Sequence, residues 1–371
     1  MKIGVLTSSR ADYGIYLSLL EELKKDTFFS LDIIAFGTHL SKSHGYTVGA
    51  IKEDEYAKIY EISSLLSNDD EQSIATSYGV TLLKFADFWA QNKYDLVLCL
   101  GDRFEMSAAV QAGIPFGVKF GHIHGGETTL GAIDNVYRHQ ISLAAVLHFT
   151  AADVFKDKLI ALLGSDVGVF SVGSISLDNI ARFEPIEKKV FYDKFSLSSE
   201  DFALVTFHPE TVGADDNYTY ALEMKNAMKQ ICQDLHLVIT MPNADTLGSI
   251  FREKIIQLQA DYPDRITLIE NFGKINYFSA MYYSKLLLGN TSSGIIEAAS
   301  FGKYVVNVGN RQKGRAQSNN IYDVPFKADD IYIAVQKAME QGQYKGNNVY
   351  YKNGAVSAIV KIIKTFYEGI Y

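Results

Sequence analysis

The 371-residue chain has few of the residues that mark disulfide-bonded, metal-bound or membrane-spanning proteins. It contains only two cysteines. Cys99 and Cys232 are far apart and each lies in an apolar run, which predicts buried thiols in a reducing compartment rather than a disulfide framework or a zinc site. No run approaches the roughly 20 apolar residues of a membrane span, and the N-terminal apolar run is too short for a signal peptide. We therefore expect a cytoplasmic protein that does not bind membranes.

Positive charge is also scarce. The chain has 35 Lys and Arg against 43 Asp and Glu, a formal net charge of −8. An acidic chain is a poor candidate for nucleic-acid binding, which needs basic clusters, so no such partner is expected. A local basic site for an anionic small molecule is still compatible with this composition. The length favours two domains.

Short apolar runs alternate with longer segments of helical period. The runs carry few polar residues, as expected for strands buried on both faces of a parallel sheet. They are Ile3–Thr7, Leu31–Phe36, Leu96–Leu100, Phe116–Phe120, Val146–Thr150, Val169–Val172, Phe202–Phe207, Leu235–Thr240, Ile266–Ile269, Leu286–Leu288 and Tyr304–Val308. This alternation predicts an α/β protein with two Rossmann-like, doubly wound domains that face a cleft.

The two sets of strands predict one domain over residues 1–174 and a second over residues 175–353. The switch falls in segment 171–180, where a strand-like run opens into small and polar residues. The last segment, 354–371, has the pattern of an amphipathic helix. We expect it to pack back on the first domain.

Polar clusters follow directly after the predicted strands, where open α/β sheets bind ligands. Arg10 follows the first strand, and an Arg beside a helix N-terminus can bind an anion. Asp12 in the same loop is equally consistent with a helix cap. Asp102 and Arg103 follow a later strand, where Asp102 is either an acid/base group or an N-cap.

The segment 121–139 is the densest ionisable stretch of the chain. Gly125 and Gly126 would let its backbone approach a ligand closely. Asp134 and Arg138 are spaced i,i+4, which places them on one helix face. The crowding favours a functional site over an ordinary loop and helical ion pair, and no Cys or HExxH pattern supports a metal. The ionisable residues are His122, His124, Glu127, Asp134, Arg138 and His139.

Polar residues also follow the strands predicted in the second half of the chain. Its candidates are His208, Asn243, Thr291, Ser292, Ser293, Glu297 and Arg311. The hydroxyls and N–H groups of Ser292 and Ser293 suit an anion, and Glu297 suits the diol of a ribose. Plain helix capping explains this turn equally well when it is taken alone. No GxGxxG opens a βαβ unit and no complete Walker motif is present, which argues against NAD and ATP as cofactors.

Together these motifs occur in the order and spacing of the UDP-N-acetylglucosamine 2-epimerases. The chain resembles the hydrolysing branch used in sialic acid synthesis, because it has HGGE where the non-hydrolysing branch usually has an E-A-G-L-R-type segment. The similarity runs from Lys2 to about Arg315 through SRADYG, GDR, HIHGGE…GAIDNVYRH, FHPE, GNTSSGIIEAASFG and GNRQKGR. The resemblance implies a fold like the GT-B glycosyltransferases, with UDP held mainly by the C-terminal domain, and a homodimer or homotetramer.

The resemblance also implies roles for individual residues. Arg10, Arg103 and His208 would contact the nucleotide or its pyrophosphate, and Asp102 and Asp134 would be catalytic carboxylates, with Arg138 orienting Asp134 or the sugar. Uridine, phosphate and ribose would be held by Asn243, Thr291, Ser292, Ser293, Glu297 and Arg311, with Glu270, Asn271 and Phe272 flanking the uracil. Several family members carry Glu at the position of His124, so either His124 or Glu127 would take over its proton transfer.

The implied reaction converts UDP-N-acetylglucosamine and water to N-acetylmannosamine and UDP. UDP would be eliminated across C1–C2, and the glycal would then add water, with no metal or other cofactor. The same reaction on a UDP-2,4-diacetamido-2,4,6-trideoxyglucose, on the way to legionaminic acid, is an alternative. A non-hydrolysing epimerase, a GT-B glycosyltransferase and a non-catalytic UDP-sugar-binding protein are further alternatives.

Overall fold

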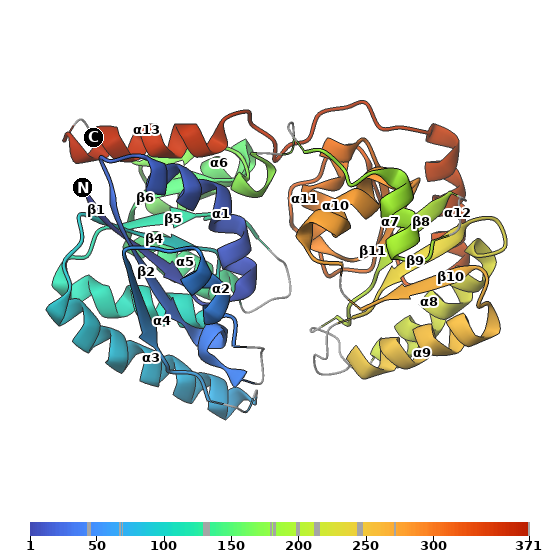
Figure 1. Cartoon of the computed structure of the whole chain (residues 1–371), viewed down its shortest axis with the longest axis horizontal. Coiled ribbons are helices and arrows are strands. Elements are labelled where there is room, and N and C mark those ends of the chain that lie inside the picture. Colours follow the sequence, from blue (N-terminus) through green and yellow to red (C-terminus); the bar gives the residue numbers. More distant parts are fainter. Residues whose placement is uncertain are drawn as a thin grey trace. The chain divides into compact units, whose positions relative to one another are not determined.

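The computed structural model describes residues 1–42, 46–66, 68, 70–128, 134–178, 180, 183–197, 201–210, 216–242, 248–270 and 272–369. The chain forms two compact units, each built around its own parallel sheet (Figure 1). The first unit contains Met1–Thr128, Ile133–Ala181 and Tyr350–Tyr371, and the second contains Arg182–Val349. The predicted α/β class is therefore confirmed.

The sheet of the first unit has seven strands in the order β3-β2-β1-β4-β5-β6-β7. The strands are β1 (Lys2–Thr7), β2 (Ser30–Phe36), β3 (Lys58–Ile62), β4 (Leu96–Leu100), β5 (Phe120–Ile123), β6 (Ala145–Thr150) and β7 (Val169–Ser171). The order reverses between β1 and β4. Doubly wound sheets bind ligands at such a switch point, outside the carboxyl ends of the strands.

Helices cover both faces of this sheet (Figure 1). They are α1 (Arg10–Lys25), α2 (Val48–Glu53), α3 (Glu71–Gln91), α4 (Phe104–Gly113), α5 (Asp134–Ala144), α6 (Asp153–Leu163) and α13 (Ala355–Tyr367). On one face, Leu19 of α1 and Ile359 of α13 join a single buried cluster with Val5 of β1. On the other face, Trp89 of α3 and Met106 of α4 pack on the sheet.

The sheet of the second unit has six parallel strands in the order β10-β9-β8-β11-β12-β13. The strands are β8 (Phe202–Thr206), β9 (His236–Thr240), β10 (Ile266–Ile269), β11 (Leu286–Gly289), β12 (Tyr304–Val308) and β13 (Ile321–Val324). The helices are α7 (Lys188–Lys194), α8 (Asn217–Ile231), α9 (Gly248–Asp261), α10 (Lys274–Tyr283), α11 (Ser292–Ile296) and α12 (Ala328–Gln341). The strand order reverses between β8 and β11, which repeats the switch point of the first unit.

Two strands that the sequence did not indicate are the edge strands β3 and β13. Each has one unpaired edge and half-exposed residues, so KIYEI and IYDV lack the continuous apolar character of a central strand. The prediction of a strand at Phe116–Phe120 was wrong. Residues Ile114–Phe116 form a 3₁₀-helix with Pro115 in its first turn and Gly117 in the left-handed conformation, so β5 begins only at Phe120.

The predicted boundary at residue 174 also differs from the division after Ala181. Residues Ile175–Leu177 form a 3₁₀-helix, and Ile175 is buried in the core of the first unit. The carboxylate of Asp178 accepts a 3.0 Å hydrogen bond from the main-chain N–H of Val356, at the start of α13. These contacts hold the segment and the C-terminal helix on the first unit.

Cys99 and Cys232 are both free and buried, as their apolar surroundings predicted. In the part of the chain that the structure describes, no helix has the length and apolar character needed to cross a membrane.

Gly289 lies at the end of β11, where the main chain of β8 comes very close. Its φ is 141°, and an added Cβ would lie 1.8 Å from the carbonyl oxygen of Thr206. We expect Gly289→Ala to lower the free energy of unfolding by more than about 1 kcal/mol, because the backbone must shift and adopt a strained conformation. Gly79→Ala, in an open position of α3, is the control and should stabilise the protein by about 0.5–1 kcal/mol. Urea unfolding compares the two, and equal effects would contradict the prediction.

Two buried histidines predict a loss of stability in acid. His122 of β5 and His148 of β6 are register partners and both are buried. Burial lowers the pKa of His122 to about 3 and that of His148 to about 4. An unfolded chain binds these protons near pH 6.5, so the folded state loses stability as the pH falls from about 6.5 toward 4, by up to about 1.4 kcal/mol per pH unit for each histidine.

The change to test is His148→Leu, which removes one of these two protonation sites. We expect a smaller fall of the melting temperature between pH 7.5 and pH 5 than in the wild-type protein. Melting curves by circular dichroism give the comparison. An unchanged fall would show that His148 does not contribute.

Candidate active site

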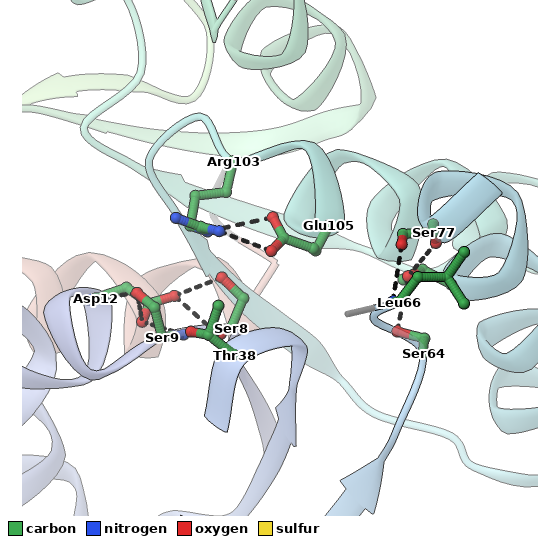
Figure 2. Close-up of polar contacts among 10 residues, drawn as sticks. Ser8, Ser9, Asp12, Thr38, Ser64, Leu66, Ser77, Arg103 and Glu105 are labelled. Carbon is green, nitrogen blue, oxygen red and sulfur yellow. Dashed lines mark hydrogen bonds and ion pairs between the residues drawn. The ribbon is translucent and has the colours of Figure 1, made fainter. Parts of the chain in front are cut away.

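The loop between β1 and α1 is organised by the buried carboxylate of Asp12. The main-chain N–H groups of Ser8 and Ser9 each donate to it at 2.8 Å, and their hydroxyls donate at 3.0 and 2.9 Å (Figure 2). Ser9 is the N-cap of α1, and Asp12, three residues later, completes a capping box with it. The interpretation of Asp12 as a helix-capping residue is therefore correct. Arg10 is the first residue of the helix and is exposed.

Arg103, directly after β4, is held by a carboxylate that the sequence analysis missed. Glu105 has no exposed side-chain surface, and its two oxygens accept bonds of 2.7 and 3.2 Å from the Arg103 guanidinium (Figure 2). Two parallel bonds of this kind fix a guanidinium in orientation as well as position. Arg103 stays 42% exposed. The available signal was that Glu105 is the only charged residue of α4.

Arg138 of α5 connects the ends of two neighbouring strands. Its buried guanidinium forms an ion pair with Asp102, after β4, and donates a 2.6 Å hydrogen bond to the carbonyl oxygen of His124, after β5. The alternative of an ordinary helical ion pair between Asp134 and Arg138 is not what the described residues show, because the guanidinium is taken by Asp102 and His124. Arg138 therefore orients Asp102 rather than Asp134.

His124 has a φ of 63°, a left-handed conformation that is rare for residues other than glycine. Its main-chain N–H donates to Phe149 at 2.9 Å, and with the Arg138 bond this holds the strained residue in place. Its ring nitrogen Nδ1 lies 3.3 Å from a Glu127 carboxylate oxygen. The other nitrogen, Nε2, is buried and has no hydrogen-bond partner among the described residues.

His122 has a structural role. Its Nε2 donates to the carbonyl oxygen of Gly101 at 2.8 Å, and its Nδ1 accepts from the Ser142 hydroxyl at 2.9 Å. It thereby fixes the residue before Asp102. The expectation that Gly126 lets the backbone approach a ligand was wrong. A Cβ at this position would lie 2.4 Å from the carbonyl oxygen of Phe155, so the glycine allows close packing of the backbone against α6.

Asp134 lies exposed at the first position of α5. Desolvation, and next the negative charge of Asp102, raise the pKa of its carboxyl group. Asp102, by contrast, is paired with a guanidinium. The two carboxyl groups therefore stand in different electrostatic environments, an arrangement that separates an acid from a base.

In the second unit, the buried residue Asn290 connects the ends of three strands. Its side chain is bonded twice to the main chain of His208, after β8. The main-chain carbonyl oxygen of Asn290 accepts from Arg311 at 3.2 Å and from Gln312 at 2.9 Å, both after β12. Burial, and next the positive charge of Arg311, lower the pKa of His208 to about 4. The sequence signal for Asn290 was its place directly after an apolar strand.

The turn before α11 is not closed by a side-chain cap. Thr291 is the N-cap residue but makes no side-chain cap bond. Ser293 is bonded to the Tyr277 hydroxyl at 2.6 Å, and Ser292 is half-buried. Glu297 follows the helix directly. Plain capping therefore does not account for the hydroxyl residues of this turn.

The segment expected to flank a uracil gives a mixed result. Glu270 is exposed and paired with Arg252. The Phe272 ring is buried against Phe191 and Phe195, so its side chain is part of the core and cannot stack on a base. Asn243 and Asn271 lie outside the described residues.

Comparison with known proteins identifies the family of this chain. A model of the UDP-N-acetylglucosamine 2-epimerase family matches residues 21–364. The chain is 33% identical to a UDP-N,N'-diacetylbacillosamine 2-epimerase (hydrolyzing) of Legionella pneumophila, over 98% of this chain and 96% of that protein. It is 30% identical to the polysialic acid biosynthesis protein P7 of Escherichia coli, over 98% of this chain and 94% of that protein.

A solved structure shows the same fold. The UDP-GlcNAc 2-epimerase from Neisseria meningitidis, bound to UDP-GlcNAc, has a TM-score of 0.80 at 17% identity, over 98% of this chain and 100% of that one. The GT-B-like fold and the resemblance to the hydrolysing branch are thus confirmed. On its motifs, its fold and the length of the match, the chain belongs to the UDP-N-acetylglucosamine 2-epimerase family.

Proposed function

We propose that this protein is a hydrolysing 2-epimerase that converts a UDP-linked 2-acetamido sugar and water to UDP and the free 2-epimeric sugar. The observation that carries the proposal is the buried ion pair of Arg138 with Asp102, which the same guanidinium joins to His124. It places a carboxylate and an imidazole at the carboxyl ends of adjacent strands. Proton transfer at a sugar carbon needs groups of this kind.

The reaction begins with elimination. A base takes the proton from C2 while the bond from C1 to the UDP oxygen breaks, and the electron pair of the C–H bond forms the C1–C2 double bond of a glycal. The leaving UDP carries negative charge. In the second unit, the Arg311 guanidinium and the turn hydroxyls of Ser292 and Ser293 provide positive charge and hydrogen-bond donors for it. Water then adds at C1 and a proton returns to the opposite face of C2.

Two faces of the sugar require two proton-handling groups. Asp102 is the base in this proposal, because its ion pair with Arg138 holds its carboxylate in place after β4. Asp134, whose pKa is raised, is the proton donor on the other face. Glu127 orients the His124 ring through Nδ1, which leaves Nε2 for proton transfer. His124 and Glu127 thus act together in the place of the Glu that other family members carry.

The proposal also specifies which sugar the substrate carries. We propose a UDP-2,4-diacetamido-2,4,6-trideoxyglucose, with UDP-GlcNAc as the second candidate. One support is the name of the L. pneumophila relative, which is 33% identical. The other is a half-exposed aromatic group beside the acidic residues, in which Tyr137 stacks on Tyr78 at 5.9 Å and lies 6.5 Å from Phe104. Such rings suit the methyl group of a 6-deoxy sugar.

The function is tested by proton NMR of the purified protein with each UDP-sugar in D₂O. We expect free UDP and a free 2-epimeric sugar that carries deuterium at C2, because the proton returned to C2 comes from solvent. The diacetamido substrate should have the higher kcat/KM, by about 10-fold or more. Release of a UDP-linked epimer would indicate the non-hydrolysing reaction, and binding of UDP without turnover of either sugar would contradict an epimerase.

The carboxylates are tested by Asp102→Asn and Asp134→Asn. Each should lower kcat by at least about 100-fold, because the amide keeps the shape but cannot exchange the proton. Asp134→Asn should change the melting temperature little, whereas Asp102→Asn should also lower it, because it removes the charged partner of the buried Arg138 guanidinium. Asp157→Asn, on the exposed side of α6, is the matched control and should keep wild-type kcat. Near-wild-type turnover of Asp102→Asn or of Asp134→Asn would show that the residue replaced takes no part in the mechanism.

A further inference from the structure

We infer that Asn290 is the positioning residue of the nucleotide site in the second unit, and that it sets the affinity for UDP without touching it. This inference rests on the proposed function, which assigns Arg311 to UDP, and on the nucleotide contact that the family resemblance implies for His208. Asn290 itself is fully buried. Its effect on a ligand must therefore pass through the residues that it holds.

The first contact is a pair of hydrogen bonds to one residue. The main-chain N–H of His208 donates to Oδ1 of Asn290 at 2.8 Å, and Nδ2 of Asn290 donates to the main-chain carbonyl of His208 at 2.8 Å. Only an amide side chain offers a donor and an acceptor side by side in this way. The pair holds the chain at the point where it leaves β8.

The second contact uses the main chain of Asn290. Its carbonyl oxygen accepts from Nη1 of Arg311 at 3.2 Å and from Nε2 of Gln312 at 2.9 Å. Its N–H donates to the carbonyl of Thr206 at 3.1 Å. One residue thus joins the ends of β8, β11 and β12, which are neighbours in the sheet.

A buried polar network of this kind has few alternative arrangements, because a lost bond leaves an unsatisfied group in the interior. Glu210 provides a partial reserve, since its carboxylate accepts a hydrogen bond from the main-chain N–H of Asn310 and so also joins the β8 and β12 loops. Without the Asn290 side chain the His208 loop should therefore be less ordered, whereas the main-chain bonds of residue 290 to Arg311 and Gln312 keep the rest of the site formed. Ordered placement of His208 and Arg311 before binding is what raises affinity for an anionic ligand.

The experiment compares Asn290→Ala with Asn320→Ala in the full chain. Asn320 is also fully buried and donates a 2.8 Å bond to the Lys303 carbonyl. It directly precedes β13, however, so it lies at the amino ends of the parallel strands and not at their carboxyl ends. Both variants lose a buried amide, so both should lower the melting temperature. We expect calorimetry to give a UDP dissociation constant at least about 10-fold weaker for Asn290→Ala, and within about twofold of wild type for Asn320→Ala.

A second readout follows His208 directly. NMR titration of His208 should give a pKa near 4 in the wild-type protein and in Asn320→Ala, and a pKa closer to 6.5 in Asn290→Ala, where the imidazole is released from burial beside Arg311. A general loss of stability would not move this value. Asn290→Ser, a smaller change whose short hydroxyl cannot make both His208 bonds, serves if the alanine variant does not fold.

The outcomes separate the inference from the function that it rests on. UDP binding by Asn290→Ala within twofold of wild type, an unchanged His208 pKa, or equal weakening in Asn320→Ala would overturn the inference. Failure of the wild-type protein to bind UDP would overturn the proposed function instead, and the His208 titration would still show whether Asn290 positions that residue.

Discussion

The strands of each sheet all run in one direction, and the chemistry of this protein depends on that constraint. Parallel neighbours lie about 4.8 Å apart, so residues that follow them meet at one edge whatever their separation along the chain. Asp102 and His124 meet in this way after β4 and β5. In the second unit, His208 and Arg311 follow β8 and β12, the two strands that flank β11.

Proximity at an edge does not by itself hold side chains in place, because loops are mobile unless their polar groups are satisfied. Both units solve this with one buried polar side chain that bonds across strand ends. In the first unit the guanidinium of Arg138 joins Asp102 to the main chain of His124. In the second, the side-chain amide of Asn290 holds the loop that follows β8, and its main-chain carbonyl accepts from Arg311 in the loop that follows β12. Arg138 and Asn290 are themselves buried, so a lost bond leaves a polar group without water or partner, at a cost of about 1–3 kcal/mol.

Much of this could be predicted from the residues alone. Nearly all the central strands were found, because strands buried on both faces must be continuously apolar, whereas the edge strands β3 and β13 were missed because they are half-exposed. The i,i+4 spacing of Asp134 and Arg138 did not reveal the partner of Arg138, for a related reason. Helical spacing shows which side chains can meet, but Arg138 found a buried partner across the sheet. Phe272 was likewise placed beside a ligand when its ring belongs to the core.

The sequence by itself determined the α/β class, the positions of the polar clusters after the strands and the family, because local patterns and motif order are properties of the chain alone. Tertiary structure alone decided which of those polar residues are buried and hold the loops and which stay exposed to solvent. Asp12, His122 and Asn290 belong to the polar clusters at the strand ends, yet each is buried and bonded to main-chain or loop groups. The physical reason is that a polar side chain takes its role from its partners and its access to solvent, and both are set by strands far apart in the chain.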